Sequence, residues 1–397
     1  MRRGLEFGCM YEMHVPEPDD IDADRIVFNN VLDQSVHAEQ HGYDSVWTVE
    51  HHFLKGWSHC SAPEVIYGAL SQRTSSVRIG HAARLLPTPY NHPVRIAEMA
   101  ATVDVLTGGR LDMGTARSLS YDEMNGFGIP PDETTPRFLE ALRMLPAMWS
   151  DDTFSWNGDY FTVPERHVVP RPVQRPHPPL WGAATGPTTH DLMGDLGIGL
   201  MSLTIMLPVE EVASRIARYR DHIAACTDPV GRFKNDQAGV FTFAHCAETD
   251  ELAREQAEAG VMHGMRSLLG LVLSTVIGSP ALNPVGPEER DYTPGERYEY
   301  LREYMSMDLD QITWDFLIDN DLVLVGTPDR INAMCERYED IGTDVLFLNN
   351  YLPGIPHLDV LHSYELMGRE VIPNWKRDRP RSTQLLEEQQ LIQAAPG

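Results

Sequence analysis

Short apolar segments alternate with segments of helical spacing along most of this chain, and this alternation is what most limits its possible folds. The predicted strands are 5–13, 43–49, 77–86, 110–116, 180–184, 199–206, 240–246 and 344–349. The predicted helices are 24–41, 63–74, 93–106, 134–149, 187–196, 208–225, 250–265, 327–341 and 357–370. Repeated βα units form a parallel sheet with helices outside it, and about eight units favour closure. The pattern predicts an α/β fold of the (β/α)8 TIM-barrel type, with 321–325 as a surplus strand.

Two insertions interrupt the alternation. The first, after strand 4, covers 151–179: it contains a predicted hairpin at 154–161, and six prolines follow it. The second, 268–306, lies after strand 7, is rich in Gly and Pro at its centre, and is predicted to be a loop over the active site. We expect one barrel domain over 1–375 and a polar, poorly ordered tail over 376–397.

Charge and cysteine usage exclude several classes of protein. The formal net charge of −26 repels nucleic acid and anionic membranes. The five cysteines are odd in number, widely spaced and without a CxxC pair, which favours a reducing cytoplasm over a disulfide framework. No apolar run of about 18 residues predicts a membrane span, and no secretory signal is apparent. A GxGxxG turn after a strand and a Walker A motif are both missing, so an open nucleotide-binding sheet is disfavoured.

The strand-end sequence Glu50-His51-His52 is the first candidate for chemistry, because barrel enzymes work at the carboxyl ends of their strands. Two imidazoles and a carboxylate could move protons or bind a metal, or could simply be solvated loop residues. Adjacent side chains on an extended chain point apart, and HExxH is missing, so we expect no metal here.

A phosphate site is the second candidate. Arg117 ends the fourth strand, where its guanidinium could hold a phosphate or form a surface ion pair. Thr185-Gly186-Pro187-Thr188-Thr189 begins the helix after the fifth strand, as an anion site or as an ordinary N-cap. Because these come from successive barrel strands, they could meet on one phosphate. Ala82-Ala83, at the end of the third strand, could let a flat ring approach the backbone or could be core.

Read together, these segments resemble a known family, the luciferase-like flavin monooxygenases. The matching segments are SVWTVEHHF at 45–53, IGHAARLLP at 79–87, HPVR at 92–95 with Glu98, GRLDMGTAR at 109–117, and VGTP at 325–328. Their order and spacing agree with the alpha subunit of bacterial luciferase over roughly residues 4–370. The segment 316–320 followed by Val325-Gly326 is similar to the diketocamphane and limonene monooxygenase branch.

The resemblance implies a two-component monooxygenase. FMN reduced by a separate NAD(P)H-dependent flavin reductase would react with O2 to a C4a-(hydro)peroxide, which would oxygenate a small, largely apolar substrate. Carried over by position, the FMN phosphate would be bound by Arg117, Thr185, Gly186 and Thr189. Ala82-Ala83 would lie against the isoalloxazine, at a peptide that is cis in the family. His51 would be catalytic, and Glu50 would support it or the ring.

The resemblance also has departures and alternatives. Ala116 stands where luciferase carries a reactive cysteine, and light emission is not predicted. A coenzyme F420-dependent oxidoreductase of the same barrel family is one alternative, and a non-catalytic flavin-binding partner subunit is another. The family resemblance also implies a homodimer packed through the first barrel helices, with His92–Val103 near the interface.

Overall fold

Eight parallel strands close into a barrel in the part of the chain that the structure describes. The structure is a computed structural model, and it describes residues 4–15, 17–118, 120–203, 207–278 and 312–376. The barrel strands are β1 (Glu6–Tyr11), β2 (Ser45–Thr48), β3 (Arg78–His81), β5 (Leu111–Ala116), β8 (Leu180–Ala184), β9 (Gly199–Ser202), β10 (Ala238–Cys246) and β12 (Val345–Asn349). Parallel pairing of β1 with β12 closes the ring, which confirms the predicted TIM barrel.

Two short strands extend this ring. β4 (Arg84–Leu85) follows β3 and pairs with the end of β5, so the predicted third strand is two strands with a break at 82–83. β11 (Leu324–Gly326) pairs with the end of β10, and among the described strands it has no other partner. The surplus strand of the sequence analysis is therefore real, and it lies outside the closed ring.

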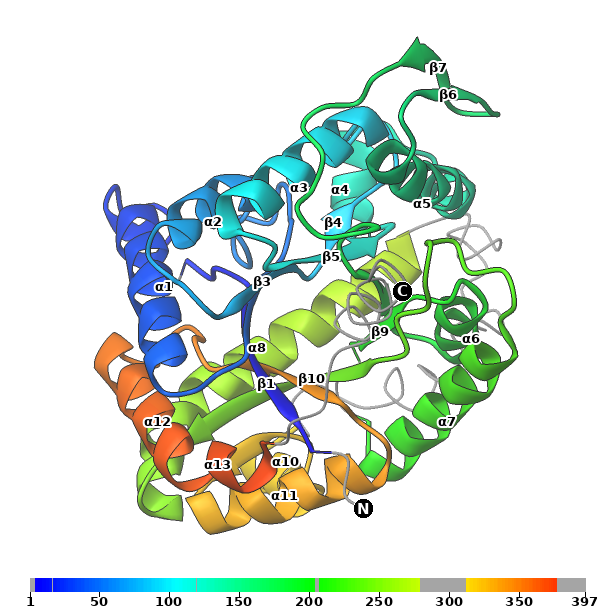
Figure 1. The fold of residues 1–397 in the computed structure, drawn as a ribbon. Helices are drawn as coiled ribbons and strands as arrows, with labels where there is room; N and C mark the ends of the chain where they lie inside the picture. The colour runs from blue at the N-terminus through cyan, green and yellow to red at the C-terminus, as the bar shows by residue number, and fades with distance from the viewer. Residues whose placement is uncertain (1–3, 16, 119, 204–206, 279–311, 377–397) are drawn as a thin grey trace.

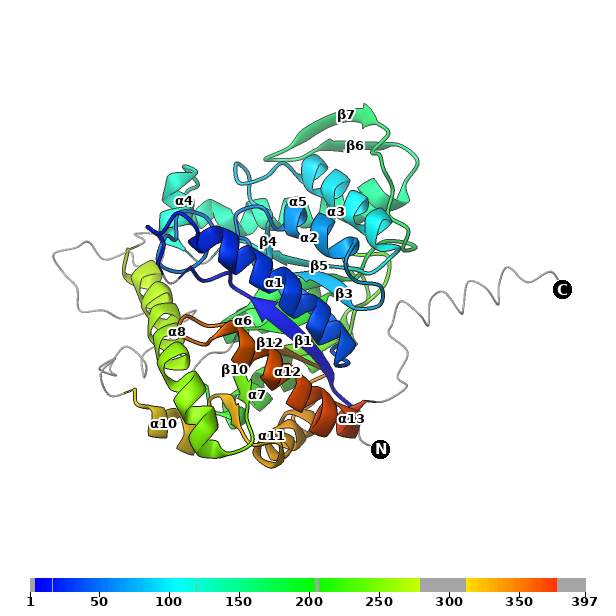
Figure 2. The same ribbon diagram turned by 90° about the vertical axis from the view of Figure 1, so that its left-hand side faces the viewer.

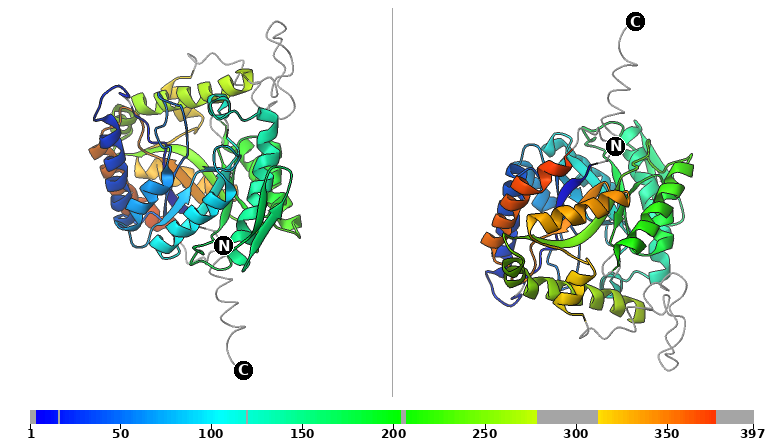
Figure 3. Two further views of the ribbon diagram at one scale, coloured as in Figure 1. Left: turned by 90° about the horizontal axis from the view of Figure 1, so that it is seen from above. Right: turned by 90° about the horizontal axis from the view of Figure 1, so that it is seen from below.

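Helices cover the outside of the barrel on all sides (Figures 1 and 3). They are α1 (Ala23–Gln40), α2 (Pro63–Ser71), α3 (Pro93–Thr107), α5 (Thr134–Ser150), α6 (Pro187–Asp195), α7 (Val209–Ala225), α8 (Asp250–Gly278), α11 (Pro328–Asp340) and α12 (His357–Glu370). Shorter helices are α4 (Tyr121–Gly126), η1 (Pro131–Glu133), α10 (Trp314–Asp319) and α13 (Ile372–Trp375). Local sequence sets the bounds of α3, for example: proline occupies its first turn, the His92 ring accepts the Val94 N–H, and Gly108 ends it with a φ of 65°.

The two insertions differ in outcome. The first contains the predicted hairpin, as the antiparallel pair β6 (Phe154–Asn157) and β7 (Thr162–Arg166) at the edge of the molecule (Figure 1). The prediction for the second insertion was wrong at its start. Residues 268–278 were expected to begin a loop, but they continue helix α8 as far as Gly278. The stretch after Met265 is apolar and contains no proline before Pro280, and Gly270 alone does not end a helix. The rest of this insertion and residues 377–397 of the tail lie outside the described residues.

Large aromatic side chains fill the interior of the barrel below its carboxyl end. Trp47 packs edge-on against Trp181 and Phe347, with ring centroids 5.6 Å and 4.9 Å apart. Gly80 makes room for this layer, because a Cβ there would lie 2.1 Å from the Trp47 ring. Trp47 and Trp181 are thus core residues, and the space for a ligand lies above them. Within the described residues, no helix is both long and apolar enough for a membrane span.

The contact between β3 and β5 gives a stability prediction. A Cβ on Gly114 would lie 1.8 Å from the His81 carbonyl oxygen, and neither backbone can move away. Gly114→Ala should therefore lower the free energy of unfolding by about 3 kcal/mol or more. Gly56→Ala is the control, since a Cβ there meets no described atom within 4 Å. Urea unfolding followed by circular dichroism measures both variants, and equal midpoints would contradict this packing.

Candidate active site

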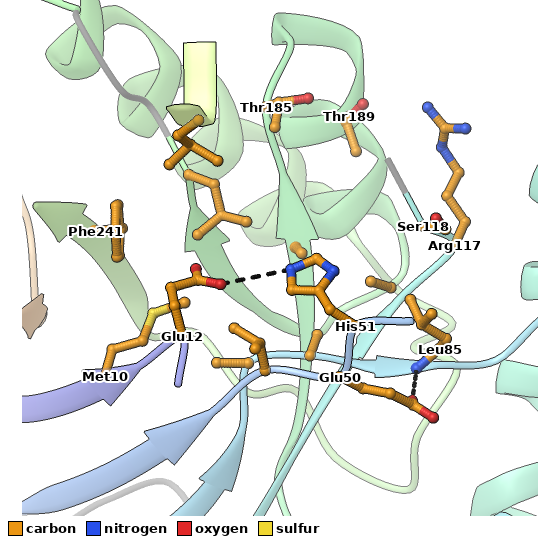
Figure 4. A pocket seen from close by; sticks show the side chains of 17 residues that line it. Met10, Glu12, Glu50, His51, Leu85, Arg117, Ser118, Thr185, Thr189 and Phe241 are labelled. Atoms are coloured by element: carbon orange, nitrogen blue, oxygen red, sulfur yellow. Dashed lines mark hydrogen bonds and ion pairs between the residues drawn. The ribbon is translucent and has the colours of Figure 1, made fainter. Parts of the chain in front are cut away.

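A cavity with about 940 Å³ of empty space opens at the carboxyl ends of the barrel strands (Figure 4). Seven of the eight residues that the sequence singled out lie on its wall: Glu50, His51, Ala82, Ala83, Arg117, Thr185 and Thr189. The eighth, Gly186, lies directly behind Thr185 as the N-cap of α6. Much of the remaining wall is apolar and includes Leu203, Phe241 and Leu268. Leu268 comes from α8, whose far end lies beside α4 (Figure 2), so the extended helix takes part in the cavity.

His51 lies between two carboxylates that the sequence analysis missed. Its Nδ1 is 2.9 Å from Oε1 of Glu123, and its Nε2 is 3.6 Å from Oε2 of Glu12. Glu12 follows β1 and belongs to the cavity wall, and Figure 4 shows the pair facing each other. Glu123 is fully buried on α4, where its carboxylate also accepts the backbone N–H of His52 at 2.9 Å and the hydroxyl of Ser118 at 2.8 Å.

A signal for each missed carboxylate was present in the sequence. Glu12 follows an apolar strand at the end where barrel enzymes hold their functional groups. Ser120 and Glu123 have the Ser-x-x-Glu spacing of a capping box, which marks the start of a helix. In the structure Ser120 does cap α4 by accepting the Glu123 N–H. The capping pattern could therefore have predicted the helix that carries Glu123. The contact of Glu123 with His51 depends on tertiary structure and could not have been predicted from that pattern.

The charges of this group follow from its contacts. Burial alone would lower the pKa of His51, but the charge and hydrogen bond of Glu123, with the charges of Glu12 and Glu50, raise it to about 9. For Glu123, burial acts upward, yet His51 and the bonds from His52 and Ser118 lower its pKa. Burial raises the pKa of Glu12, with His51 opposing. At neutral pH the site therefore holds an imidazolium that donates from Nδ1 to an ionised Glu123.

The raised pKa of His51 can be tested without any activity. Glu123→Gln keeps the size of the side chain and removes the largest upward influence, so the pKa of His51 should fall toward its ordinary value. NMR titration of the histidine rings measures it, with Glu64→Gln, on α2, as the control. An unchanged His51 titration in Glu123→Gln would contradict this account.

The raised pKa of His51 also affects the stability of the fold. It contributes stability that is complete below about pH 6.5 and is lost as the pH rises through about 9.

The hydrogen bonds and ion pairs of the Glu50 carboxylate within the described residues go to groups other than the His51 ring. Its carboxylate accepts the backbone N–H of Leu85 at 2.7 Å and a side-chain N–H of Asn91 at 3.0 Å. Arg84 lies 3.4 Å away, and the His52 ring 3.3 Å away. Glu50 thus ties the second strand end to the segment after 82–83. Its charge also contributes to the raised pKa of His51.

The Ala82–Ala83 peptide is cis, as the resemblance implied. Both residues are buried on the cavity wall, together with Ala116 and Ala183. These short side chains leave open space beside the backbone. A broad, flat ring could lie there in contact with peptide groups.

The phosphate candidates gather on one side of the cavity. In Figure 4 the Arg117 guanidinium and the hydroxyls of Thr185 and Thr189 lie on the same side, above His51. Thr185 and Thr189 flank the N-terminus of α6, whose dipole attracts an anion. Arg117 donates to Thr134 at 3.2 Å, which helps to orient it. Buried Arg215 donates to the Thr185 carbonyl and fixes the turn from behind. A cation, hydroxyls and a helix N-terminus are what a phosphate monoester requires.

The cavity therefore suits FMN at both ends. Its walls are mostly apolar, and its few polar groups include an anion site on one side, as in many cofactor sites. Arg117, Thr185 and Thr189, with the α6 N-terminus, would hold the phosphate. The Ala82–Ala83 peptide would lie along the ring, near His51.

Known proteins similar to this chain include flavin-dependent monooxygenases and F420-dependent enzymes. The oxygenase component of a flavin-dependent trigonelline monooxygenase from Acinetobacter baylyi is 27% identical over 210 residues, 52% of this chain and 57% of that protein. The chain thus spans little more than half of that relative. Limonene 1,2-monooxygenase from Rhodococcus erythropolis is 25% identical over 345 residues, 86% of this chain and 80% of that protein. An F420-dependent glucose-6-phosphate dehydrogenase from Microbacterium testaceum is 29% identical over 212 residues, covering 49% and 61%.

Solved structures and a family model cover more of the chain. The oxygenating constituent of 3,6-diketocamphane monooxygenase from Pseudomonas putida, solved with FMN, superposes with a TM-score of 0.72 at 20% identity. The match covers 94% of this chain and 99% of that one, and at this identity it supports the fold alone. The family model described as luciferase-like monooxygenase matches residues 6–345. Since that match runs from the first barrel strand to the start of the last, and so covers most of the chain, the chain belongs to the luciferase-like monooxygenase family.

Proposed function

We propose that this protein is the oxygenase of a two-component system that uses reduced FMN and O2 to oxygenate a small, largely apolar organic substrate. A separate NAD(P)H-dependent flavin reductase supplies the reduced FMN, and both proteins work in the cytoplasm. One atom of O2 enters the substrate, the other leaves as water, and the two electrons come from the reduced flavin. The observation that carries the proposal is the single cavity that combines an anion site at one end with a protonated His51 beside an apolar wall.

Each part of the cavity has a role in this reaction. Bound reduced FMN supplies the electrons that activate O2, and the protein supplies orientation, dryness and protons. Arg117 and the α6 N-terminus bind the phosphate, and the Ala82–Ala83 peptide leaves room for the ring. Leu203, Phe241 and Leu268 exclude water and favour an apolar substrate. His51 holds a proton at Nε2 on the cavity side, and Glu123 keeps the ring charged and oriented.

The direct test is product formation with isotopic oxygen. Purified protein receives FMN, a flavin reductase, NADH and ¹⁸O2, with a panel of aldehydes, cyclic ketones and terpenes. We expect one ¹⁸O atom in the product of the accepted substrate, and none when the protein is omitted. If reduced FMN does not bind to the protein, or if turnover with bound flavin proceeds without O2, the proposal is wrong.

An F420-dependent oxidoreductase is the second candidate. The carboxylates on both sides of His51 also suit it, because hydride transfer from an alcohol needs a group that takes the hydroxyl proton, and hydride transfer to a carbonyl needs a group that gives one. Competitive titration of F420 against FMN separates the candidates, and anaerobic turnover would favour F420. A non-catalytic partner subunit is the third, and substitution of His51 tests it below.

We also propose a homodimer through α2 and α3. Val65 on α2 and Val105 and Leu106 on α3 expose large apolar side chains, with exposed fractions of 67%, 47% and 48%. Apolar side chains on neighbouring helices are typical of a subunit interface. Val65→Asp with Leu106→Asp should turn a dimer into a monomer in light scattering, and a monomeric wild type would refute the proposal.

A further inference from the structure

The seam between α1 and α12 carries polar side chains that the proposed function does not use. These are the first and last long helices around the barrel, and they lie side by side in Figures 1 and 2. His37 and His41 are one turn apart at the end of α1, and Glu365 of α12 faces them. Their nitrogen and oxygen atoms lie within 4.8 Å of one another, and none of the three lines the active-site cavity.

The contact between His37 and Glu365 is unusual. Nε2 of His37 is 3.3 Å from Oε1 of Glu365, yet this buried nitrogen has no hydrogen-bond partner within the described residues. The two atoms are therefore close without the geometry of a hydrogen bond. A metal ion bound to both would satisfy the nitrogen lone pair and the carboxylate together.

His41 is oriented in the way that metal-binding histidines usually are. Its Nδ1 donates to the His37 carbonyl at 2.8 Å, so Nε2 of the neutral ring is left with its lone pair. A backbone carbonyl that takes one ring N–H fixes the tautomer and the ring direction. The two rings lie close, with centroids 4.2 Å apart.

We propose that His37, His41 and Glu365 form a binding site for a divalent transition-metal ion of the zinc class. Bonds of about 2.0–2.1 Å at a tetrahedral angle put two ligand atoms about 3.3 Å apart, which matches the His37–Glu365 separation. Two imidazoles and one carboxylate suit Zn²⁺, whereas Mg²⁺ and Ca²⁺ prefer oxygen ligands. Water completes the coordination, because the Glu365 side chain is 45% exposed.

Neighbouring contacts hold the three ligands in place. Gly368 of α12 lies so close to α1 that a Cβ would be 2.4 Å from the His41 carbonyl oxygen. His362 lies 3.8 Å from the second carboxylate oxygen of Glu365, and its other nitrogen is 2.6 Å from Glu248. A bound ion would join the first helix to the last, next to the β1–β12 pair that closes the barrel. Its role is therefore to stabilise the closed fold.

The test uses the full chain without a purification tag, treated with EDTA and dialysed. Calorimetric titration with ZnCl2 should show one saturable site per chain, and Zn²⁺ should raise the melting temperature. His37→Ala and Glu365→Gln should weaken binding by about 100-fold or more, since loss of an outer-shell partner alone costs 10–100-fold. His167→Ala removes an exposed histidine elsewhere and should bind like the wild type.

The variants also keep the proposal falsifiable. Circular dichroism of each metal-free variant checks that it is folded, and Glu365→Gln preserves the size of the side chain. Co²⁺ in place of Zn²⁺ should give the visible absorption of a tetrahedral site in the wild type and lose it in both ligand variants. Equal Zn²⁺ binding by wild type and His37→Ala, or equal losses in His167→Ala, would overturn the proposal.

Discussion

Replacement of His51 by asparagine is expected to lower kcat by about 10²–10⁴-fold, the range for a positioned acid or base. The side-chain amide of asparagine can still donate to Glu123, as Nδ1 of His51 does at 2.9 Å. What is lost is the proton at Nε2, on the side of Glu12 and the cavity. Reduced FMN should bind within a few-fold of the wild-type affinity, because the phosphate site is formed by other residues.

Turnover with the accepted substrate and binding of reduced FMN measure the two effects separately. His222→Asn is the matched control, since it removes a histidine that also faces a carboxylate, Asp195 at 2.7 Å, but on the exposed side of α7. We expect the control to keep wild-type turnover. If His51→Asn turns over like the wild type, the histidine is not catalytic, and the partner-subunit alternative gains its support.

Most of the fold could be predicted from the sequence because the βα alternation is local. Proline at helix starts and glycine at helix ends, as at Pro93 and Gly108, fix bounds that neighbouring residues alone determine. The error at α8 came from the composition of the following segment. Residues 266–278 border a Gly- and Pro-rich stretch, which favoured a loop, although no proline interrupts them before Pro280.

Part of the candidate site could also be predicted from the sequence, and part could not. His51, Arg117 and the Thr185–Thr189 turn stand at strand ends, where the barrel brings residues together whatever their separation in sequence. Glu123 could not be assigned to His51, because a short helix with no strand of its own carries it to the ring. The proposed zinc site combines residues from both ends of the chain, and no spacing rule joins them. Our sequence analysis therefore expected no metal.

Replacement of Arg117 by methionine is expected to weaken FMN binding by about 10- to 100-fold, because a charge-assisted bond contributes about 1.5–3 kcal/mol. Methionine keeps most of the apolar stem and removes the charge. Riboflavin has the same ring without the phosphate, so its binding should change little. The wild type should prefer FMN to riboflavin strongly, and the variant should lose most of this preference.

Fluorescence titration of both ligands, with wild type and variant, separates phosphate recognition from any general change of the cavity. Arg25→Met is the control, since Arg25 is an exposed arginine of α1 whose side chain is 68% exposed and pairs with Asp22. Thr189→Val should act in the same direction as Arg117→Met but more weakly, because it removes a neutral hydroxyl. If Arg117→Met weakens FMN and riboflavin by the same factor, Arg117 supports the cavity wall and does not bind the phosphate. The anion end of the cavity would then have to be formed by the α6 N-terminus without it.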